Sequence, residues 1–463
     1  MSKEKIIIVD LGFGDQGKGT TIDFLADRLK AELVIRYLGG PQTAHNVVEP
    51  EGRHHTFAQF GSGTFVGAKT HLSYFMSINP LELEAEAEAL MAKGINNPFD
   101  LITFDAHSLI VTPFHVHLNR MREIARGRKR NGSCGKGFGE TIRDARNNVS
   151  LRFSDFGTDG LQRKMDFLWR YKIDQAEQIV DDNSDNKELI KFLHFLKNKD
   201  YVKLLVEAYD RILTKHQLKF RPTEIVLEEA KGTLIFEGAQ GVLLDERFGF
   251  YPHITHSNTT SENADMLIAG SQAKARRIGI LRVYATRHGA GPFVTEDRFL
   301  TETIPDVHNK LDKWQQKFRI GWFDLVTARY ALAVGGKIDE LALTCLDRLD
   351  GMEEIKVCTA YEYKGRDRSG LDDFFHFEKH KGRIRINGIK PDFSQEKNDG
   401  RLAKMMFSCR PLEWKIFRGW KKSNNQIAPE MAVYINYIQS AEAMGVPVSI
   451  VSLGPTRNDK IVI

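Results

Sequence analysis

The chain has 463 residues and a formal net charge of +5, with 41% hydrophobic and 27% charged residues. This composition is typical of a globular protein, and so small an excess of charge fits anionic small ligands at least as well as nucleic acid. No segment offers about 18 uncharged apolar residues, so we expect no membrane span. A first strand begins within five residues of Met1, which leaves no room for a signal peptide.

The cysteine pattern indicates a reducing compartment. Four cysteines occur, and none has C-x-x-C spacing: Cys134, Cys345, Cys358 and Cys409. The absence of this spacing argues against a zinc site and for free thiols. We therefore expect a cytoplasmic protein.

The first predicted element is an apolar strand at residues 6–9, followed by a glycine-rich turn and an amphipathic helix. Apolar residues at Ile22, Leu25, Ala26 and Leu29 have the spacing of one buried helix face. Glycines in the turn permit positive φ, so that successive N–H groups can point at a phosphate near the helix N-terminus. This arrangement predicts a phosphate-loop-like nucleotide site.

The loop departs from the usual phosphate-loop pattern in two ways. The spacing from Gly12 to Lys18 fits G-x-x-x-x-G-K, but Gly19 stands where a serine or threonine normally ligates magnesium. An acid, Asp15, lies inside the loop. An acid would repel phosphate there unless a metal or a proton-transfer role compensates. The loop therefore indicates chemistry as well as binding.

Strands and helices then alternate along the chain. The pattern predicts a helix at 81–93 and strands at 33–37, 101–104, 234–236, 278–283, 341–344, 355–363 and 448–451. A long charged helical pattern at about 161–219 predicts a surface helical excursion. The polar, turn-rich stretch at about 364–396 predicts a peripheral insertion. We expect an α/β fold in a single domain over 1–463, with a large, mostly parallel central sheet and helices on both faces.

Glycine-rich or polar loops follow several of these strands, at residues 39–46, 132–139, 237–241, 251–260, 286–293 and 452–457. In an open α/β sheet, such loops converge on a ligand crevice at the carboxyl ends of the strands. Each loop alone is weak evidence. Together, behind a phosphate loop, they predict one composite site.

In their order along the chain and in their amino-acid sequences, these loops resemble those of the adenylosuccinate synthetase family. Residues 14–19 (GDQGKG) are similar to the family's GDEGKGK, 36–45 to RYxGGxNAGH, 236–241 to FEGAQG and 251–260 to YPxVTSSNTT. Matching segments continue at 286–293, 321–324, 346–351 and 452–455. The resemblance spans nearly the whole chain and implies the same fold.

The resemblance implies a two-step ligation in which GTP phosphorylates the 6-oxygen of IMP and L-aspartate then displaces the phosphate. Asp15 would accept the N1 proton, and His45 would donate to the charge that develops on the 6-oxygen. Lys18 would hold phosphates. Mg²⁺ would be ligated by Asp15 and by the Ala44 carbonyl.

The remaining binding residues follow from the same resemblance. Besides Lys18, those implied for GTP are Gly14, Gly17, Gly19, Asp347, Ser452 and Gly454, with Asp347 accepting from guanine. Those implied for the purine nucleotide are Gln42, Ser133, Cys134, Gln240 and Thr255. Lys317 and Arg319 are the cations near the expected aspartate loop.

Several positions depart from the family pattern. Cys345 replaces the lysine of T-K-x-D, and residues 312–320 are not the usual threonine-, glycine- and arginine-rich loop, since only Lys317 and Arg319 remain as nearby cations. The arginine that the family supplies across its dimer interface aligns with Asn148, with Arg143 or Arg146 as candidate substitutes. Gln42, Ser133, Cys134, His256 and residues 261–263 also replace usual residues around the acceptor.

These departures leave alternatives open. The first is the same ligation on GMP or dGMP, which the retained Asp15 disfavours because phage-type relatives with such substrates replace that acid. The second is a guanine-nucleotide sensor that no longer ligates. We expect a homodimer that acts on small molecules, without a nucleic acid or membrane partner.

Overall fold

In the computed structural model, the described residues are 4–270, 274–304, 306, 314, 317–380, 382–393, 399–421 and 426–463. They form a nine-stranded sheet in the order β19-β18-β13-β10-β1-β9-β2-β5-β7. Its strands are β1 (Lys5–Asp10), β2 (Leu33–Arg36), β5 (Lys69–Leu72), β7 (Ile102–Phe104), β9 (Leu234–Glu237), β10 (Ala275–Arg282), β13 (Glu340–Thr344), β18 (Val448–Ser452) and β19 (Lys460–Val462). Neighbouring strands described in this sheet pair in parallel, except that β18 and β19 are antiparallel. The predicted parallel sheet is confirmed.

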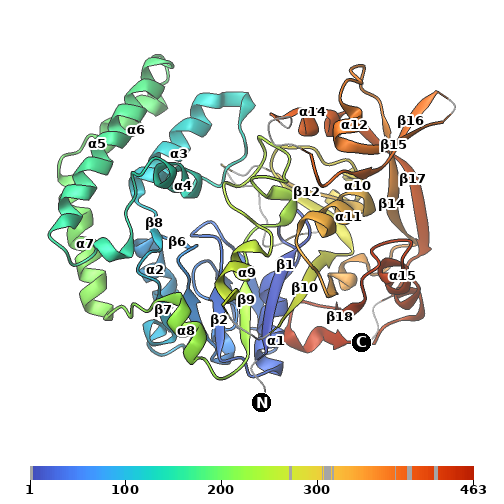
Figure 1. The fold of residues 1–463 in the computed structure, drawn as a ribbon, viewed down its shortest axis with the longest axis horizontal. Coiled ribbons are helices and arrows are strands. Elements are labelled where there is room, and N and C mark those ends of the chain that lie inside the picture. Colours follow the sequence, from blue (N-terminus) through green and yellow to red (C-terminus); the bar gives the residue numbers. More distant parts are fainter. Residues whose placement is uncertain are drawn as a thin grey trace.

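The helices are α1 (Lys18–Arg28), α2 (Pro80–Met91), α3 (Pro113–Arg126), α4 (Phe138–Arg146), α5 (Gly160–Asp181), α6 (Lys187–Leu196), α7 (Asp200–His216), α8 (Thr223–Glu229), α9 (Glu262–Ile268), α10 (Arg298–Thr303), α11 (Leu325–Val334), α12 (Leu371–Phe374), α14 (Arg401–Phe407) and α15 (Pro429–Gln439). The helix predicted at 81–93 forms as α2, because Asn79 caps its N-terminus and Pro80 occupies the first turn. Residues 161–219 form α5, α6 and α7, which stand together at one side of the molecule (Figure 1). No helix of the described residues is long and apolar enough to cross a membrane.

A second sheet lies at the opposite side of the molecule (Figure 1). It contains β11 (Tyr284–His288), β12 (Phe318–Asp324), β14 (Glu354–Tyr363), β15 (Phe375–His380), β16 (Arg383–Ile389) and β17 (Cys409–Arg418). The described part of 364–396 supplies α12, β15 and β16 to this sheet. Phe374 and Ile386 are fully buried there, so this segment belongs to the hydrophobic core.

Two short ribbons complete the fold, one of β3 (His45–Val48) with β4 (His54–Phe57) and one of β6 (Ser77–Ile78) with β8 (Leu109–Ile110). β3 begins with the predicted catalytic residue His45. The antiparallel pairing of β3 with β4 therefore fixes the backbone that carries this side chain.

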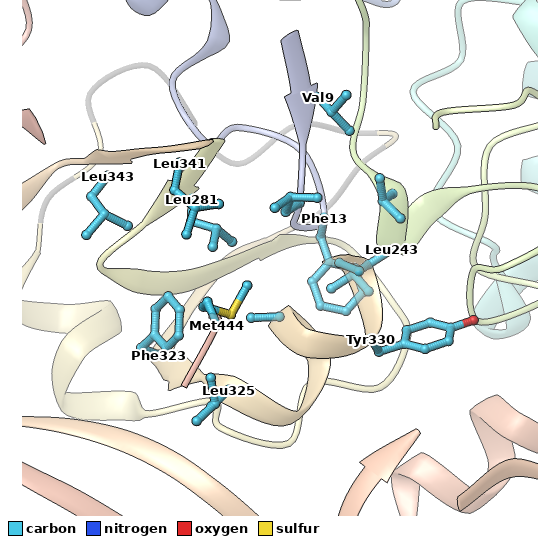
Figure 2. Packing of buried hydrophobic residues seen from close by; sticks show 14 of the residues in the cluster. Val9, Phe13, Leu243, Leu281, Phe323, Leu325, Tyr330, Leu341, Leu343 and Met444 are labelled. Atoms are coloured by element: carbon cyan, nitrogen blue, oxygen red, sulfur yellow. The ribbon is translucent and has the colours of Figure 1, made fainter. Parts of the chain in front are cut away.

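The largest hydrophobic cluster lies under the glycine-rich loop. Phe13, which belongs to that loop, points into the cluster beside Leu243 (Figure 2). Its ring is 8% exposed and packs against Phe250 and Phe293. Burying a phenylalanine side chain contributes about 2 kcal/mol. The loop is thus anchored to the core by its own side chain.

Candidate active site

A cleft of about 250 Å³ lies where the loops that follow β1, β2, β9 and β11 meet α3 and α4. The predicted site residues that line it are Gly14, Asp15, Lys18, Gln42, Ala44, His45, Ser133, Cys134, Gln240 and Thr255. These residues span 242 positions of the sequence, from 14 to 255. The loops that follow β1, β2 and β9 meet because these strands are neighbours in a parallel sheet.

The backbone of the glycine-rich loop is left-handed at Gly14 (φ 85°), Asp15 (φ 60°) and Gly17 (φ 94°), and α1 starts directly after Gly17. This conformation directs N–H groups toward the helix N-terminus. At Gly19, an added Cβ would lie 2.8 Å from the carbonyl oxygen of Asn46. β3 thus packs too closely to admit the serine or threonine that the phosphate-loop pattern normally has there.

Lys18 is held at the base of the loop by a buried acid. Its Nζ lies 2.5 Å from Oδ2 of Asp10 and donates to the carbonyl of Gln240 at 2.8 Å. Asp10 ends β1 and also accepts from the N–H groups of Gly12 and Gln16. Burial raises the pKa of Asp10, against the opposing effect of Lys18. The acid therefore fixes both the loop backbone and its lysine.

His45 pairs with a second buried acid, Glu237, at the end of β9. Nδ1 of His45 lies 2.5 Å from Oε1 of Glu237, which also accepts from the hydroxyl of Ser62. Burial opposes ionisation of Glu237, but the Arg36 charge and the hydrogen bond from His45 outweigh it and lower the pKa to about 2. Burial lowers the pKa of His45 to about 4, despite the neighbouring carboxylate. Since the carboxylate only accepts, the neutral imidazole carries its proton on Nδ1, and Nε2 is left for a ligand.

Asp15 is held by two residues of the β10–β11 segment. Its Oδ2 lies 3.2 Å from Nε2 of His288, and its backbone carbonyl accepts from Nε of Arg282. Burial raises the pKa of this carboxyl. The hydrogen bond from His288 and the charges of His288, Arg282 and Lys18 together outweigh that effect and lower the pKa to about 2. Asp15 is therefore ionised at neutral pH and can accept a proton.

The acceptor side of the cleft holds polar groups suited to a ligand. Both amide atoms of Gln42 and Oε1 of Gln240 are buried and make no hydrogen bond within the described residues. Ser133 donates to Asn119 at 3.1 Å, and Thr255 lies beside them in the cleft wall. Burial raises the pKa of the Cys134 thiol to about 11, so this thiol is neutral.

Arg143 and Arg146, the candidate substitutes for the family's arginine at position 148, have different surroundings. Arg143 lines the cleft, where it donates to Oε1 of Glu140 at 2.7 Å. Arg146 pairs with Glu246 instead and does not line the cleft. Asn148 is exposed just beyond α4. Arg143 thus presents a cation to the cleft from the same chain.

The residues predicted for guanine lie outside the cleft lining but close together. Asp347 follows β13, Ser452 ends β18, the neighbouring strand of the sheet, and Gly454 follows it. Thr344 at the end of β13 donates to the carbonyl of Gln16 at 2.6 Å, which connects this edge to the phosphate loop. Nζ of Lys460 donates to the carbonyl of Gly454 at 3.0 Å.

Lys317 and Arg319, the two cations predicted to bind aspartate, do not line the cleft. Lys317 is exposed. Arg319 donates to Oε2 of Glu296 and to the carbonyl of Gly291, each at 2.8 Å. Of the expected aspartate loop, 312–320, residues 312, 313, 315 and 316 lie outside the described residues.

The donor set of the cleft fits Mg²⁺. Among the described residues, no group of three or more His, Cys, Asp or Glu residues could form a closed metal cage. Mg²⁺ needs no such cage, because it keeps several waters and takes one or two carboxylates together with substrate phosphates. The carboxylate of Asp15 and the carbonyl of Ala44, which both line the cleft, match that demand.

Sequence reasoning did not single out four residues that shape this site: Asp10, Glu237, Arg282 and His288. Glu237 stands inside the FEGAQG segment and His288 inside 286–293, so the motifs carried a signal for both. Asp10 and Arg282 end the strands β1 and β10, which is where an α/β sheet places functional groups.

The fold and the cleft define an α/β enzyme with a phosphate-loop-like site at the carboxyl ends of its parallel strands. A family model described as adenylosuccinate synthetase matches residues 7–461, so the chain belongs to the adenylosuccinate synthetase family. Members of this family are carbon–nitrogen ligases that use GTP and Mg²⁺.

Individual relatives agree with this assignment. The chain is similar to an adenylosuccinate synthetase of Trichodesmium erythraeum, at 31% identity over 99% of this chain and 96% of the relative. It is 31% identical to that of Nostoc punctiforme, over 99% and 94% of the two chains.

Two solved structures share the fold. A fully ligated adenylosuccinate synthetase from Plasmodium falciparum aligns with a TM-score of 0.73 at 20% identity, over 99% of both chains. A succinoaminodeoxyadenylate synthetase from cyanophage S-2L, bound to dGMP and to dATP as an energy donor, aligns with a TM-score of 0.56 at 16% identity, over 100% of this chain and 96% of that chain.

Proposed function

We propose that this protein joins L-aspartate to C6 of IMP, with GTP as the phosphoryl donor, and so forms adenylosuccinate. The observation that carries the proposal is that Asp15, His45 and Lys18 line one cleft, with Glu237 bonded to His45 and Asp10 bonded to Lys18. Together these residues supply a base, a proton donor and a phosphate ligand.

In the first step, Asp15 accepts the N1 proton of the purine, and the 6-oxygen attacks the γ-phosphorus. The bond to the β-phosphate oxygen breaks and GDP leaves. Lys18 and the N–H groups of residues 14–19 hold the phosphates. His45 takes up a proton on Nε2 beside these anions and donates a hydrogen bond from this nitrogen to the charged 6-oxygen, while Glu237 stabilises the imidazolium.

In the second step, the amino group of aspartate attacks C6, the C6–O bond breaks, and inorganic phosphate leaves with the oxygen and takes up the proton that the amine loses. Asp347 accepts from N1 and N2 of guanine, beside Ser452 and Gly454. The acceptor nucleotide lies against Gln42, Ser133, Cys134, Gln240 and Thr255. Lys317 and Arg319, which do not line this cleft, would contact the aspartate.

Mg²⁺ would be held by Asp15 and the Ala44 carbonyl, and it would neutralise charge on the phosphates of GTP. We further propose that the enzyme is a homodimer in the cytoplasm. Size-exclusion chromatography with light scattering tests the first point, and fractionation of the source cells tests the second.

Mass spectrometry of reactions with GTP, Mg²⁺ and L-aspartate tests the function, with IMP, GMP or dGMP as acceptor and phosphate release followed in parallel. A succinyl adduct of IMP is the expected product. An adduct only with GMP or dGMP would assign the protein to the 2-aminopurine reaction, and GTP binding without phosphate release would indicate a sensor. The Asp15→Ala variant is expected to lose phosphate release, and full turnover by it would contradict the proposed role of this acid.

A further inference from the structure

Asp15 stands on a loop that does little to orient its carboxylate. It lies between Gly14 and Gly17, its φ of 60° is left-handed, and its side chain is 30% exposed. A base must be held close to its productive geometry, since a displacement of about 1 Å can reduce the rate about 100-fold. The orientation of this carboxylate must therefore come from outside the loop.

Three residues outside the loop provide that hold, Arg282 at the end of β10, His288 at the end of β11 and Phe318 at the start of β12, and we name them the Asp15 brace. Nε2 of His288 lies 3.2 Å from Oδ2 of Asp15, and Nε of Arg282 donates to the Asp15 carbonyl. The Phe318 ring lies 4.8 Å from the His288 ring and 5.9 Å from the Arg282 guanidinium. One aromatic side chain thus contacts both groups that hold the aspartate.

The imidazole is itself fixed by the sheet. His288 is the last residue of β11 and pairs directly with Phe318 of β12, and the next N–H, that of Gly289, donates to the Lys317 carbonyl at 2.9 Å. A group placed on paired strands is positioned more accurately than one on a loop. The paired strands β11 and β12 therefore fix the position of His288, and its hydrogen bond orients the carboxylate of Asp15.

We propose that His288 is a positioning residue that binds Oδ2 of Asp15 and leaves Oδ1 for the purine N1 proton. This inference rests on the proposed function, because it assigns Asp15 the role of base. His288 acts through the carboxylate. Its removal is expected to lower kcat and to leave the KM for GTP nearly unchanged.

Three variants separate hydrogen bonding from packing. His288→Phe keeps a ring against Phe318 but cannot donate, and His288→Ala removes both. His288→Gln places an amide N–H near the former Nε2. We expect kcat to fall about 10- to 100-fold in His288→Phe and His288→Ala. In His288→Gln it should return to within about threefold of the wild type, with the KM for GTP within about threefold throughout.

A matched pair elsewhere provides the control. Nδ1 of His107 lies 3.2 Å from Oδ1 of Asp105, but this histidine is 76% exposed and outside the cleft. His107→Ala and His107→Gln should leave kcat unchanged. Wild-type kcat in His288→Phe, or equal loss in His288→Gln and His288→Ala at unchanged Tm, would overturn the proposal.

Crystal structures without ligand provide a readout that does not depend on ligation. Asp15 should occupy one conformer in the wild type and in His288→Gln, and several in His288→Phe. A single Asp15 conformer in all of them would overturn the positioning role. A wild type that gives no adduct with any acceptor would instead contradict the proposed function, while the Asp15 conformers would still decide the role of His288.

Discussion

Replacing Glu237 with glutamine should disable His45 without touching the cleft directly. Oε1 of Glu237 accepts from Nδ1 of His45 and from the Ser62 hydroxyl, and Oε2 accepts from the Ser62 N–H at 2.9 Å. If the amide oxygen of the introduced glutamine faces His45, its NH₂ group meets the Ser62 N–H, donor against donor. If the amide is flipped, His45 must accept at Nδ1 and change tautomer. Either arrangement removes the charge that stabilises the imidazolium.

The size of the effect follows from the hydrogen bond that is lost. A hydrogen bond to a charged group contributes about 1.5–3 kcal/mol, which corresponds to about 10- to 150-fold in rate. We therefore expect kcat for phosphate release with GTP, IMP and L-aspartate to fall by about that factor in Glu237→Gln. Ser62→Ala keeps the carboxylate charge and should change kcat less than about threefold, because it removes one neutral donor.

A double-mutant cycle tests whether Glu237 acts through His45. Because Glu237 acts through His45, the His45→Ala, Glu237→Gln double variant should be about as slow as His45→Ala alone. Additive losses, or wild-type kcat in Glu237→Gln, would refute the pairing as the basis of catalysis. Circular dichroism and Tm of each variant exclude unfolding as the cause, since Glu237 also balances the charge of buried Arg36.

Three further predictions concern stability and donor binding. Burial raises the pKa of Asp324 to about 6, against the hydrogen bond from Tyr361, so its contribution to stability is present at low pH and is lost as the pH rises toward 6 and above. In urea unfolding, the wild type should gain about 1 kcal/mol over Asp324→Asn between pH 7 and pH 5, and parallel pH profiles would contradict this. Lys460→Met removes the ammonium bound to the Gly454 carbonyl and should raise the KM for GTP, while the KM for IMP stays unchanged; equal changes in both would argue against a guanine-side role. Leu343→Ala, in the fully buried strand β13, should cost about 2–5 kcal/mol of unfolding free energy, and a loss below about 1 kcal/mol would indicate that the cavity collapses.

The local structure and the family resemblance could be predicted from the amino-acid sequence alone. Apolar runs of period near two and 3.6 identified the strands and helices, because these periods reflect which faces of each element are buried. The conformation of the glycine-rich loop before Lys18 could also be predicted, because a positive φ, as at Gly14 and Gly17, favours glycine over other residues. Motif order along the chain was enough to indicate the adenylosuccinate synthetase family.

Which side chains act together depends on the three-dimensional fold and could not be predicted from the sequence. Glu237 and His45 are 192 residues apart in the sequence. Asp15, in the loop after β1, contacts His288 at the distant end of β11. No local periodicity encodes such contacts, because they depend on strand order in the sheet and on how closely neighbouring loops pack. For the same reason the sequence left Arg143 and Arg146 equivalent, whereas the orientation of α4 places only Arg143 in the cleft wall.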